Sequence, residues 1–170
     1  MATAARRVLG VDTALRSTGI GVVELDGGKL RAVELGTVRN PARWLLSQCL
    51  AGLHRGITEA IDRTRPDAAA IEGVFFAKNV RTSVILGEAR GAVIAACATA
   101  GVAVYEYPPR RVKQAVVGFG GAEKEQVRRM VMSLLGLVET PQEDAGDALA
   151  IAICHLHCRT QYAELAPKEI

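Results

Sequence analysis

The chain has 170 residues, 49% of them hydrophobic, and a net charge of +3. This length fills one domain and leaves little room for a second, so we expect a single domain over 1–170 that ends in a short polar tail at 161–170. No long apolar leader opens the chain, and its longest apolar run, GAVIAACATAGVAV, is too short to cross a bilayer, so we expect a cytoplasmic protein.

The predicted elements alternate after an all-strand start. Five strands are expected, near 7–12, 19–25, 30–39, 67–72 and 102–107, with a turn at Asp26-Gly27-Gly28. Four helices are expected: from Asn40-Pro41 to about Arg63, over 82–100, and from starts near Glu123 and Pro141. This order predicts an α/β fold, with a mixed five-stranded sheet and helices on both faces.

Two acids follow apolar strands directly. Asp12 closes the run VLGV, and Glu72 closes the run AAAI. In open α/β sheets ligands bind where strands end, so both positions favour a site. For Asp12 taken alone, a turn-capping role is the simpler interpretation.

Two further acids open the last predicted helix. Thr140 is its expected N-cap, with Pro141 at the first helical position and Glu143 completing a capping box. Asp144 and Asp147 then lie on one face, in the first two turns. A favourable helix dipole explains Asp144 equally well, but Asp147 shares the stripe of the apolar run ALAIAI and has no lysine or arginine nearby in sequence.

Converging carboxylates need a cation. Hard oxygen donors without a paired His or Cys pattern suit Mg²⁺ or Mn²⁺. Two such ions can activate a water and stabilise the leaving oxygen of a phosphodiester. The four acids therefore indicate nuclease chemistry.

Five segments, in order, resemble the RuvC-type Holliday junction resolvases over roughly 7–158: LGVDTALRSTGIGVVE, IEGVFFAKN, LGEARGAVIAA, YPPRRVKQAVVGFGGAEKEQV and PQEDAGDALAIAICH. The resemblance implies an RNase H-like fold and a homodimer that makes paired symmetric nicks in a four-way DNA junction. It also implies two Mg²⁺ ions per active site, with Mn²⁺ able to substitute, and work beside a branch-migration helicase of the RuvA and RuvB type. The family's catalytic, metal-binding carboxylates match Asp12, Glu72, Asp144 and Asp147.

A basic window precedes the last helix, and a basic patch beside acids suits a phosphate backbone. It holds Arg110, Arg111, Lys113, Lys124, Arg128 and Arg129. A solvated helix face is the alternative. By resemblance, Lys113 and Lys124 match DNA-contacting lysines, Phe75 matches an aromatic residue that stacks at the cleavage point, and Lys78 and Asn79 belong to a DNA-contacting loop.

The apolar segment 81–99 contains small residues that permit close helix approach. In a monomer it would be core. The resemblance places the dimer interface here, around Gly87, Arg90 and Gly91.

One departure from the family lies beside Asp12. The family usually continues with Pro-Gly, whereas this chain has Thr13-Ala14, which disfavours a positive φ in that loop. A junction-binding protein with impaired cleavage is therefore one alternative. A RuvC-like nuclease for another branched DNA or for structured RNA is a second.

Three other interpretations are weaker. Actin-like ATPases and sugar kinases share the expected core, but they need a second lobe for which this length has no room. The run Cys154-His155-Leu156-His157-Cys158 could attract zinc, but one helix cannot fold four donors around one ion. The glycines of VVGFGGAEKEQ match neither a dinucleotide fingerprint nor a P-loop.

Overall fold

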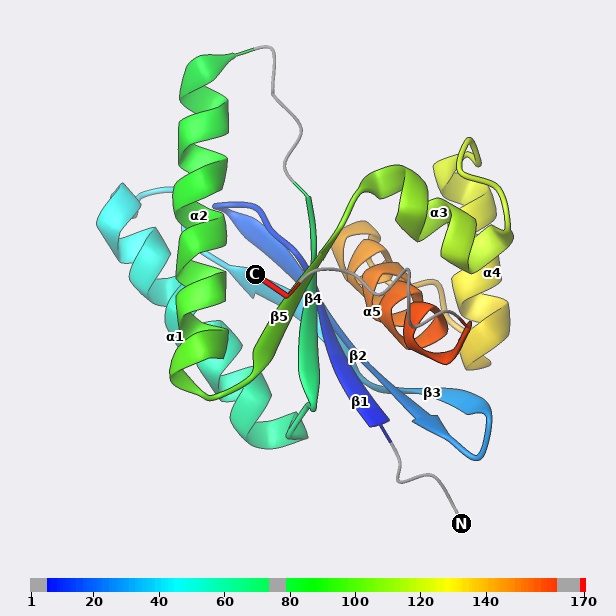
Figure 1. Cartoon of the computed structure of the whole chain (residues 1–170). Helices are drawn as coiled ribbons and strands as arrows, with labels where there is room; N and C mark the ends of the chain where they lie inside the picture. The colour runs from blue at the N-terminus through cyan, green and yellow to red at the C-terminus, as the bar shows by residue number, and fades with distance from the viewer. Residues whose placement is uncertain (1–5, 74–78, 162–168) are drawn as a thin grey trace.

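The computed structural model describes residues 6–73, 79–161 and 169–170 (Figure 1). Five strands form one sheet in the order β3-β2-β1-β4-β5. Their bounds are β1 Arg6–Asp12, β2 Ser17–Asp26, β3 Lys29–Arg39, β4 Ala68–Glu72 and β5 Ala103–Tyr107. The first three strands pair antiparallel, whereas β4 and β5 run parallel to β1. The predicted mixed sheet is confirmed, with every strand boundary within two residues of its expected place.

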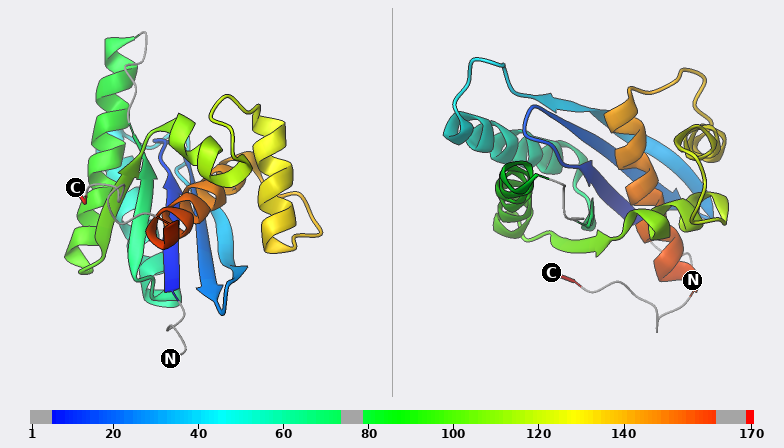
Figure 2. Two further views of the ribbon diagram at one scale, coloured as in Figure 1. Left: turned by 45° about the vertical axis from the view of Figure 1, so that its right-hand side comes forward. Right: turned by 90° about the horizontal axis from the view of Figure 1, so that it is seen from above.

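Helices cover both faces of this sheet, as predicted (Figure 2). On one face lie α1 (Leu46–Thr64) and α2 (Val80–Thr99); on the other lie α3 (Pro109–Val117), α4 (Lys124–Leu135) and α5 (Glu143–Gln161). The two sides of β1 supply two separate cores, because successive side chains of a strand point to opposite faces. Val8 packs in the core with α5, whereas Leu9 packs in the core with α1 and α2.

α5 lies directly against the middle of the sheet. A Cβ at Gly10 of β1 would lie 1.9 Å from the carbonyl oxygen of Ala148, and one at Gly21 of β2 would lie 2.8 Å from the backbone nitrogen of Leu149. Only glycine permits so close an approach of two backbones. The first turns of α5 are thereby brought to the edge where β1 ends.

The predicted start of α1 is wrong. α1 begins at Leu46, and Asn40 does not cap it. Instead the Asn40 amide donates to the carbonyls of Leu15, at 2.7 Å, and Cys49, at 3.0 Å. Arg16 donates to the Pro41 carbonyl at 2.7 Å. Tertiary hydrogen bonds have replaced the expected cap, so 40–45 forms a tethered loop.

Two helices near the basic window also differ from expectation. α5 begins at Glu143, not at Pro141, and the Gly146 amide donates to the Gln142 carbonyl at 2.8 Å. The Glu143 side chain pairs with Lys124 instead of closing a capping box. α3 was not predicted, although Pro109 in its first turn and Gly118 after its end, with φ 82°, are ordinary helix punctuation.

α2 is long and apolar enough, by length and composition alone, to resemble a membrane span, which the sequence pattern did not predict. Only 22% of its most apolar stretch is buried. It packs on α1 and β5, and its first half extends past the sheet (Figure 1). At the far end of the chain, the Ile170 amide donates to the Val104 carbonyl at 3.0 Å, so 169–170 lie along the edge of β5.

Candidate active site

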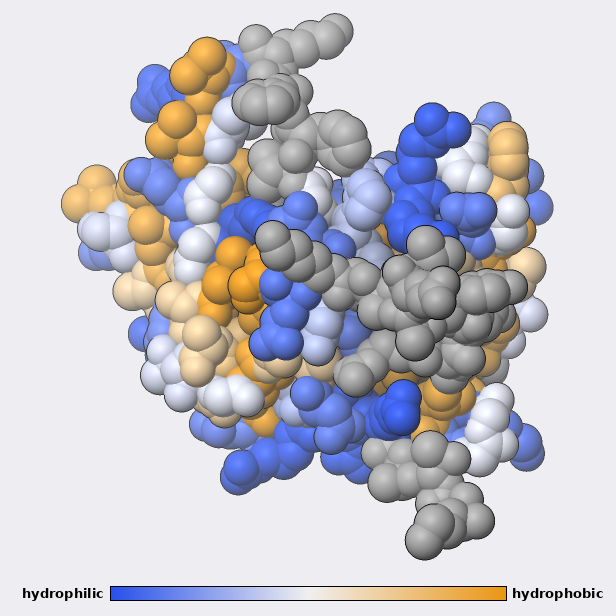
Figure 3. Space-filling view, in the orientation of Figure 1, coloured by the Kyte–Doolittle hydropathy of each residue, from blue (hydrophilic) through white to orange (hydrophobic). Residues whose placement is uncertain are grey.

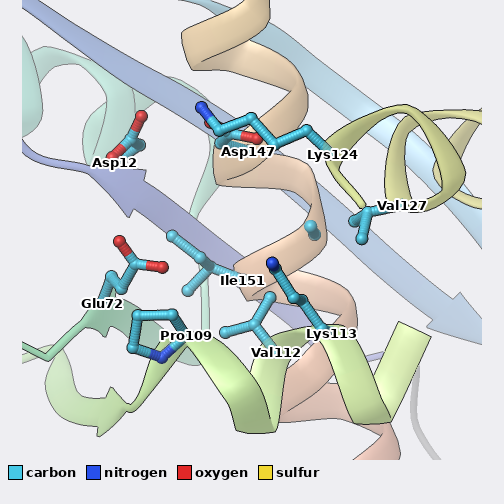
Figure 4. Close-up of a pocket in the computed structure, with 10 residues that line it drawn as sticks. Asp12, Glu72, Pro109, Val112, Lys113, Lys124, Val127, Asp147 and Ile151 are labelled. Carbon is cyan, nitrogen blue, oxygen red and sulfur yellow. The ribbon is translucent and has the colours of Figure 1, made fainter. Parts of the chain in front are cut away.

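Three of the four predicted acids line one cavity of about 350 Å³ (Figure 4). Asp12 comes from the end of β1, Glu72 from the end of β4, and Asp147 from the second turn of α5. Parallel strands end at the same edge of a sheet, which explains why Asp12 and Glu72 meet. Two lysines and five apolar residues form the rest of the lining. The sequence analysis did not single out the apolar residues, which are Pro109, Val112, Val127, Ala150 and Ile151.

The fourth acid, Asp144, does not line the cavity. Its carboxylate accepts a hydrogen bond of 2.5 Å from the hydroxyl of Ser17, the first residue of β2. The i, i+3 spacing keeps it on the same side of α5 as Asp147. Its charge still reaches the cavity, because it contributes to the raised pKa of Asp12.

Burial and mutual repulsion make these carboxylates reluctant to ionise. Burial, followed by the charges of Asp147, Glu72 and Asp144, raises the pKa of Asp12 to about 7. Burial also raises the pKa of Glu72 and of Asp147. The cluster is therefore short of positive charge, and a cation would be strongly attracted to it.

Two lysines partly supply that charge. The Lys124 ammonium lies 2.8 Å from Glu143 Oε1 and 3.6 Å from Asp147 Oδ2, and these acids raise its pKa. Lys113 lines the same cavity from α3 (Figure 4). Both predicted DNA-contacting lysines are therefore placed beside the acids. The pairing of Lys124 with Glu143 was not foreseen, because the sequence assigned Glu143 to a helix cap.

The four carboxylates are suitable ligands for a hard divalent cation, but their side chains do not converge on a single point in this structure. Over 6–73, 79–161 and 169–170, no three acidic, His or Cys side chains stand close enough to hold a metal ion. Two of the acids have other partners instead: Asp144 accepts from the Ser17 hydroxyl, and Asp147 lies 3.6 Å from the Lys124 ammonium. Carboxylate oxygens that raise one another's pKa are the donors that Mg²⁺ or Mn²⁺ binds.

The zinc interpretation gains no support. The thiols of Cys154 and Cys158 lie 4.0 Å apart, but the imidazoles between them are engaged elsewhere. His155 Nδ1 is 2.7 Å from the Tyr107 hydroxyl, and His157 Nδ1 is 2.8 Å from the Ala115 carbonyl.

The remaining predicted DNA contacts are dispersed. Phe75 and Lys78 lie outside the described residues. Asn79 caps α2, accepting from the Arg81 amide at 2.9 Å. Arg110 is exposed and Arg111 half-buried on α3, and neither lines the cavity.

The Thr13-Ala14 loop keeps Asp12 in the cavity. The Ala14 amide donates to the Thr18 hydroxyl at 3.1 Å, and that hydroxyl donates back to the Ala14 carbonyl. Within the described part of the chain, Arg65 is the only non-glycine residue with positive φ, so Ala14 needs no glycine-like backbone. Among the residues that the structure describes, the buried Thr13 hydroxyl finds no hydrogen-bond partner.

Comparison with known proteins gives one consistent result. The family model described as Crossover junction endodeoxyribonuclease RuvC matches residues 8–155. A protein of that name from Chloroflexus aggregans is 49% identical over 152 residues, covering 89% of this chain and 93% of its own length.

Solved structures show the same likeness in three dimensions. The Thermus thermophilus RuvC structure is 35% identical, with a TM-score of 0.87, and the match covers 96% of this chain and 99% of that one. T. thermophilus RuvC in complex with Holliday junction substrate is 33% identical, with a TM-score of 0.86 and the same coverage. The expected RNase H-like fold is thereby confirmed.

Proposed function

The chain belongs to the RuvC family of crossover junction endodeoxyribonucleases and is a Holliday junction resolvase, and we propose that it cuts by paired symmetric nicks with two Mg²⁺ ions per active site. One observation carries the proposal: Asp12, Glu72 and Asp147 share a cavity with Lys113 and Lys124. Acids gather cations, and lysines attract phosphate, so the cavity suits a phosphodiester that is to be hydrolysed.

The four carboxylates are the proposed metal ligands. When bound, the ions activate a water and stabilise the leaving oxygen, and Mn²⁺ is able to replace Mg²⁺. Asp12, Glu72 and Asp147 already face the cavity, and Asp144 reaches it by leaving Ser17. Because the pKa of Asp12 is raised to about 7, this acid gives up a proton as it takes up the cation.

The lysines have a different proposed role, which is to hold the DNA backbone. Lys124 also borders a second hollow, of about 260 Å³, that continues the first and includes Arg128. Together these hollows offer a path for one strand across α4 and α5. Arg110 and Arg111 extend the positive surface along α3, and Phe75, Lys78 and Asn79 keep their proposed DNA contacts at the loop before α2.

We also propose a homodimer that pairs through α2. Val80 is 79% exposed and Val84 is 56% exposed, and the upper part of the helix shows hydrophobic surface in Figure 3. No atom of the described residues lies within 4 Å of where a Cβ would stand at Gly87 or Gly91, so a second helix could approach closely there. A second copy would cover this surface and place two active sites on one junction.

Partners and location follow from the family. A helicase of the RuvA and RuvB type would move the junction into the site, and the enzyme would work in the cytoplasm with the DNA. The exposed apolar face of α2 is explained here by a protein partner and requires no membrane.

The test is cleavage of a mobile four-way junction against a linear duplex of the same sequence. Wild type is compared with Asp144→Asn, and with Asp26→Asn at the end of β2 as a matched control. Paired nicks on the junction alone, lost in EDTA and in Asp144→Asn only, support the proposal. Binding without cutting would identify a structural junction protein, and cutting of other branched DNA or structured RNA a different nuclease.

A further inference from the structure

Glu72, the last residue of β4, is paired in the sheet register with β5 but not with β1. Pairing between β4 and β1 stops one residue earlier, where Ile71 lies opposite Val11. Pairing with β5 continues, with Glu72 opposite Tyr107, and the Gly73 amide donates to the Tyr107 carbonyl at 2.8 Å. The register with β1 has therefore ended at the residue whose carboxylate faces the cavity, and the register with β5 continues.

Arg90 of α2 makes a further contact with the backbone at this point. Its Nη1 donates to the backbone carbonyl of Glu72 at 3.2 Å, and its Nη2 forms an ion pair with Glu106 of β5. The Arg90 side chain is only 12% exposed, although Gly87 and Gly91 beside it on the helix are exposed. A guanidinium that has left water needs its partners, and its planar fork can hold two acceptors at once.

We infer that Arg90 is a positioning residue, which ties α2 to the ends of β4 and β5 and so fixes the backbone from which Glu72 reaches into the cavity. The inference rests on the proposed function, because it takes Glu72 as a metal ligand. It also gives Arg90 a task inside its own subunit, where the family resemblance suggested a contact across the dimer.

The effect on Glu72 is geometric. Burial raises the pKa of Glu72, and the main charges that shift it are those of Asp147, Lys124 and Lys113. Arg90 touches the main chain of Glu72 and leaves its carboxylate free for the cavity. Loss of Arg90 should therefore misplace the carboxylate without changing the charge balance of the site.

Four single variants of the full chain test this inference. Arg90→Gln removes the guanidinium, and Arg90→Lys keeps a cation that can reach one partner. Arg63→Gln is the matched control, because it breaks an exposed arginine pair with Glu34, which does not line the cavity. Glu72→Gln tests the proposed ligand itself.

Three measurements are made on each: Mn²⁺ affinity by calorimetry without DNA, single-turnover cleavage at saturating protein, and junction affinity in EDTA. Arg90→Gln should weaken Mn²⁺ binding and slow cleavage by about 10-fold to 100-fold, as loss of a ligand's supporting contact usually does. Arg90→Lys should recover part of both. Junction affinity in EDTA should stay within about twofold, and Arg63→Gln should match wild type throughout.

The outcomes separate the two claims. If Glu72→Gln cuts and binds Mn²⁺ normally, the proposed role of Glu72 as a metal ligand fails, and the inference for Arg90 loses its premise. If Glu72→Gln is inactive while both Arg90 variants bind Mn²⁺ and cut like wild type, only the inference is overturned. If Arg90→Gln does not fold, Arg90→Lys decides: normal Mn²⁺ affinity and rate with a lowered unfolding temperature would leave Arg90 a purely structural residue.

Discussion

Gly19 and Asp144 meet backbone to backbone: a Cβ at Gly19 would lie 1.9 Å from the carbonyl oxygen of Asp144. The contact joins β2 to the first turn of α5, two residues from Ser17, which donates to the Asp144 carboxylate. Because Gly19 has no side chain, α5 can pack closely on β2, and this packing sets the position of Asp144. The position of the site depends on this packing as much as on the acids themselves.

Gly19→Ala should therefore damage both stability and cleavage. The added methyl group has to push α5 away from β2, and overpacking of this kind costs about 1–3 kcal/mol or more. Asp144 should move with the helix, so cleavage should fall further than the loss of folded protein explains. Thermal unfolding and single-turnover cleavage measure the two effects. Gly36→Ala in β3, where a Cβ has nothing within 4 Å, is the control and should behave like wild type.

Asp12→Asn should stabilise the metal-free protein at alkaline pH while abolishing cleavage. Asp12 holds its proton to about pH 7 in the folded state, against an ordinary value of 3.8. The folded state therefore binds more protons between these values, so wild-type stability falls as pH rises through that window and stays low above it. The gain from the substitution is at most about 4 kcal/mol, at roughly 1.36 kcal/mol per pKa unit.

Urea unfolding in EDTA checks this at two pH values. The stabilisation should be present above pH 7 and absent near the ordinary Asp value. Equal free energies of unfolding for wild type and Asp12→Asn at alkaline pH would contradict the raised pKa of Asp12.

Lys124→Met should separate metal binding from DNA binding. The Lys124 ammonium competes with a cation for Asp147, so its removal should tighten Mn²⁺ binding at a pH above 7, by an amount limited to about 1 kcal/mol for so exposed a pair. Junction binding should weaken, with the slope of log affinity against log salt reduced by about one. Calorimetry and salt titrations give both values, with Lys29→Met at the start of β3 as control. A weaker Mn²⁺ affinity would show that Lys124 assists the cation.

Val84→Glu should prevent dimer formation. A charge on the exposed apolar face of α2 would have to be buried between two copies, which is costly. Sedimentation should show a monomer that still binds a junction arm but no longer makes paired nicks. Val138→Glu, at a side chain that is 96% exposed between α4 and α5, should leave the assembly intact. A Val84→Glu protein that remains dimeric would place the interface elsewhere.

The sequence was sufficient for the strands but not for all helix ends. Alternating and apolar runs, with Asp26-Gly27-Gly28 between two of them, located the sheet because they depend on neighbours in sequence. The starts of α1 and α5 depended instead on distant partners, since Asn40 bonds to Leu15 and Cys49, and Glu143 to Lys124. α3 was missed even though Pro109 and Gly118 mark its two ends.

The same distinction applies to the site. Asp12 and Glu72 could be placed together because parallel strands end at one edge. The hydrogen bond from Ser17 to Asp144 joins residues 127 positions apart, and the Arg90 contact with Glu72 joins a helix to a strand end. No local pattern reports such contacts, so they needed the three-dimensional arrangement.

The aliphatic side of the cavity affects the thermodynamics of substrate binding. Val112, Val127 and Ile151 offer water no hydrogen bonds, so water beside them is loosely held and is released when a nucleotide enters. Association at this point should therefore carry a negative change in heat capacity. The contribution of counterion release to affinity falls as salt is added, whereas this hydrophobic contribution does not. The enzyme should therefore retain part of its affinity for the junction at high salt concentration.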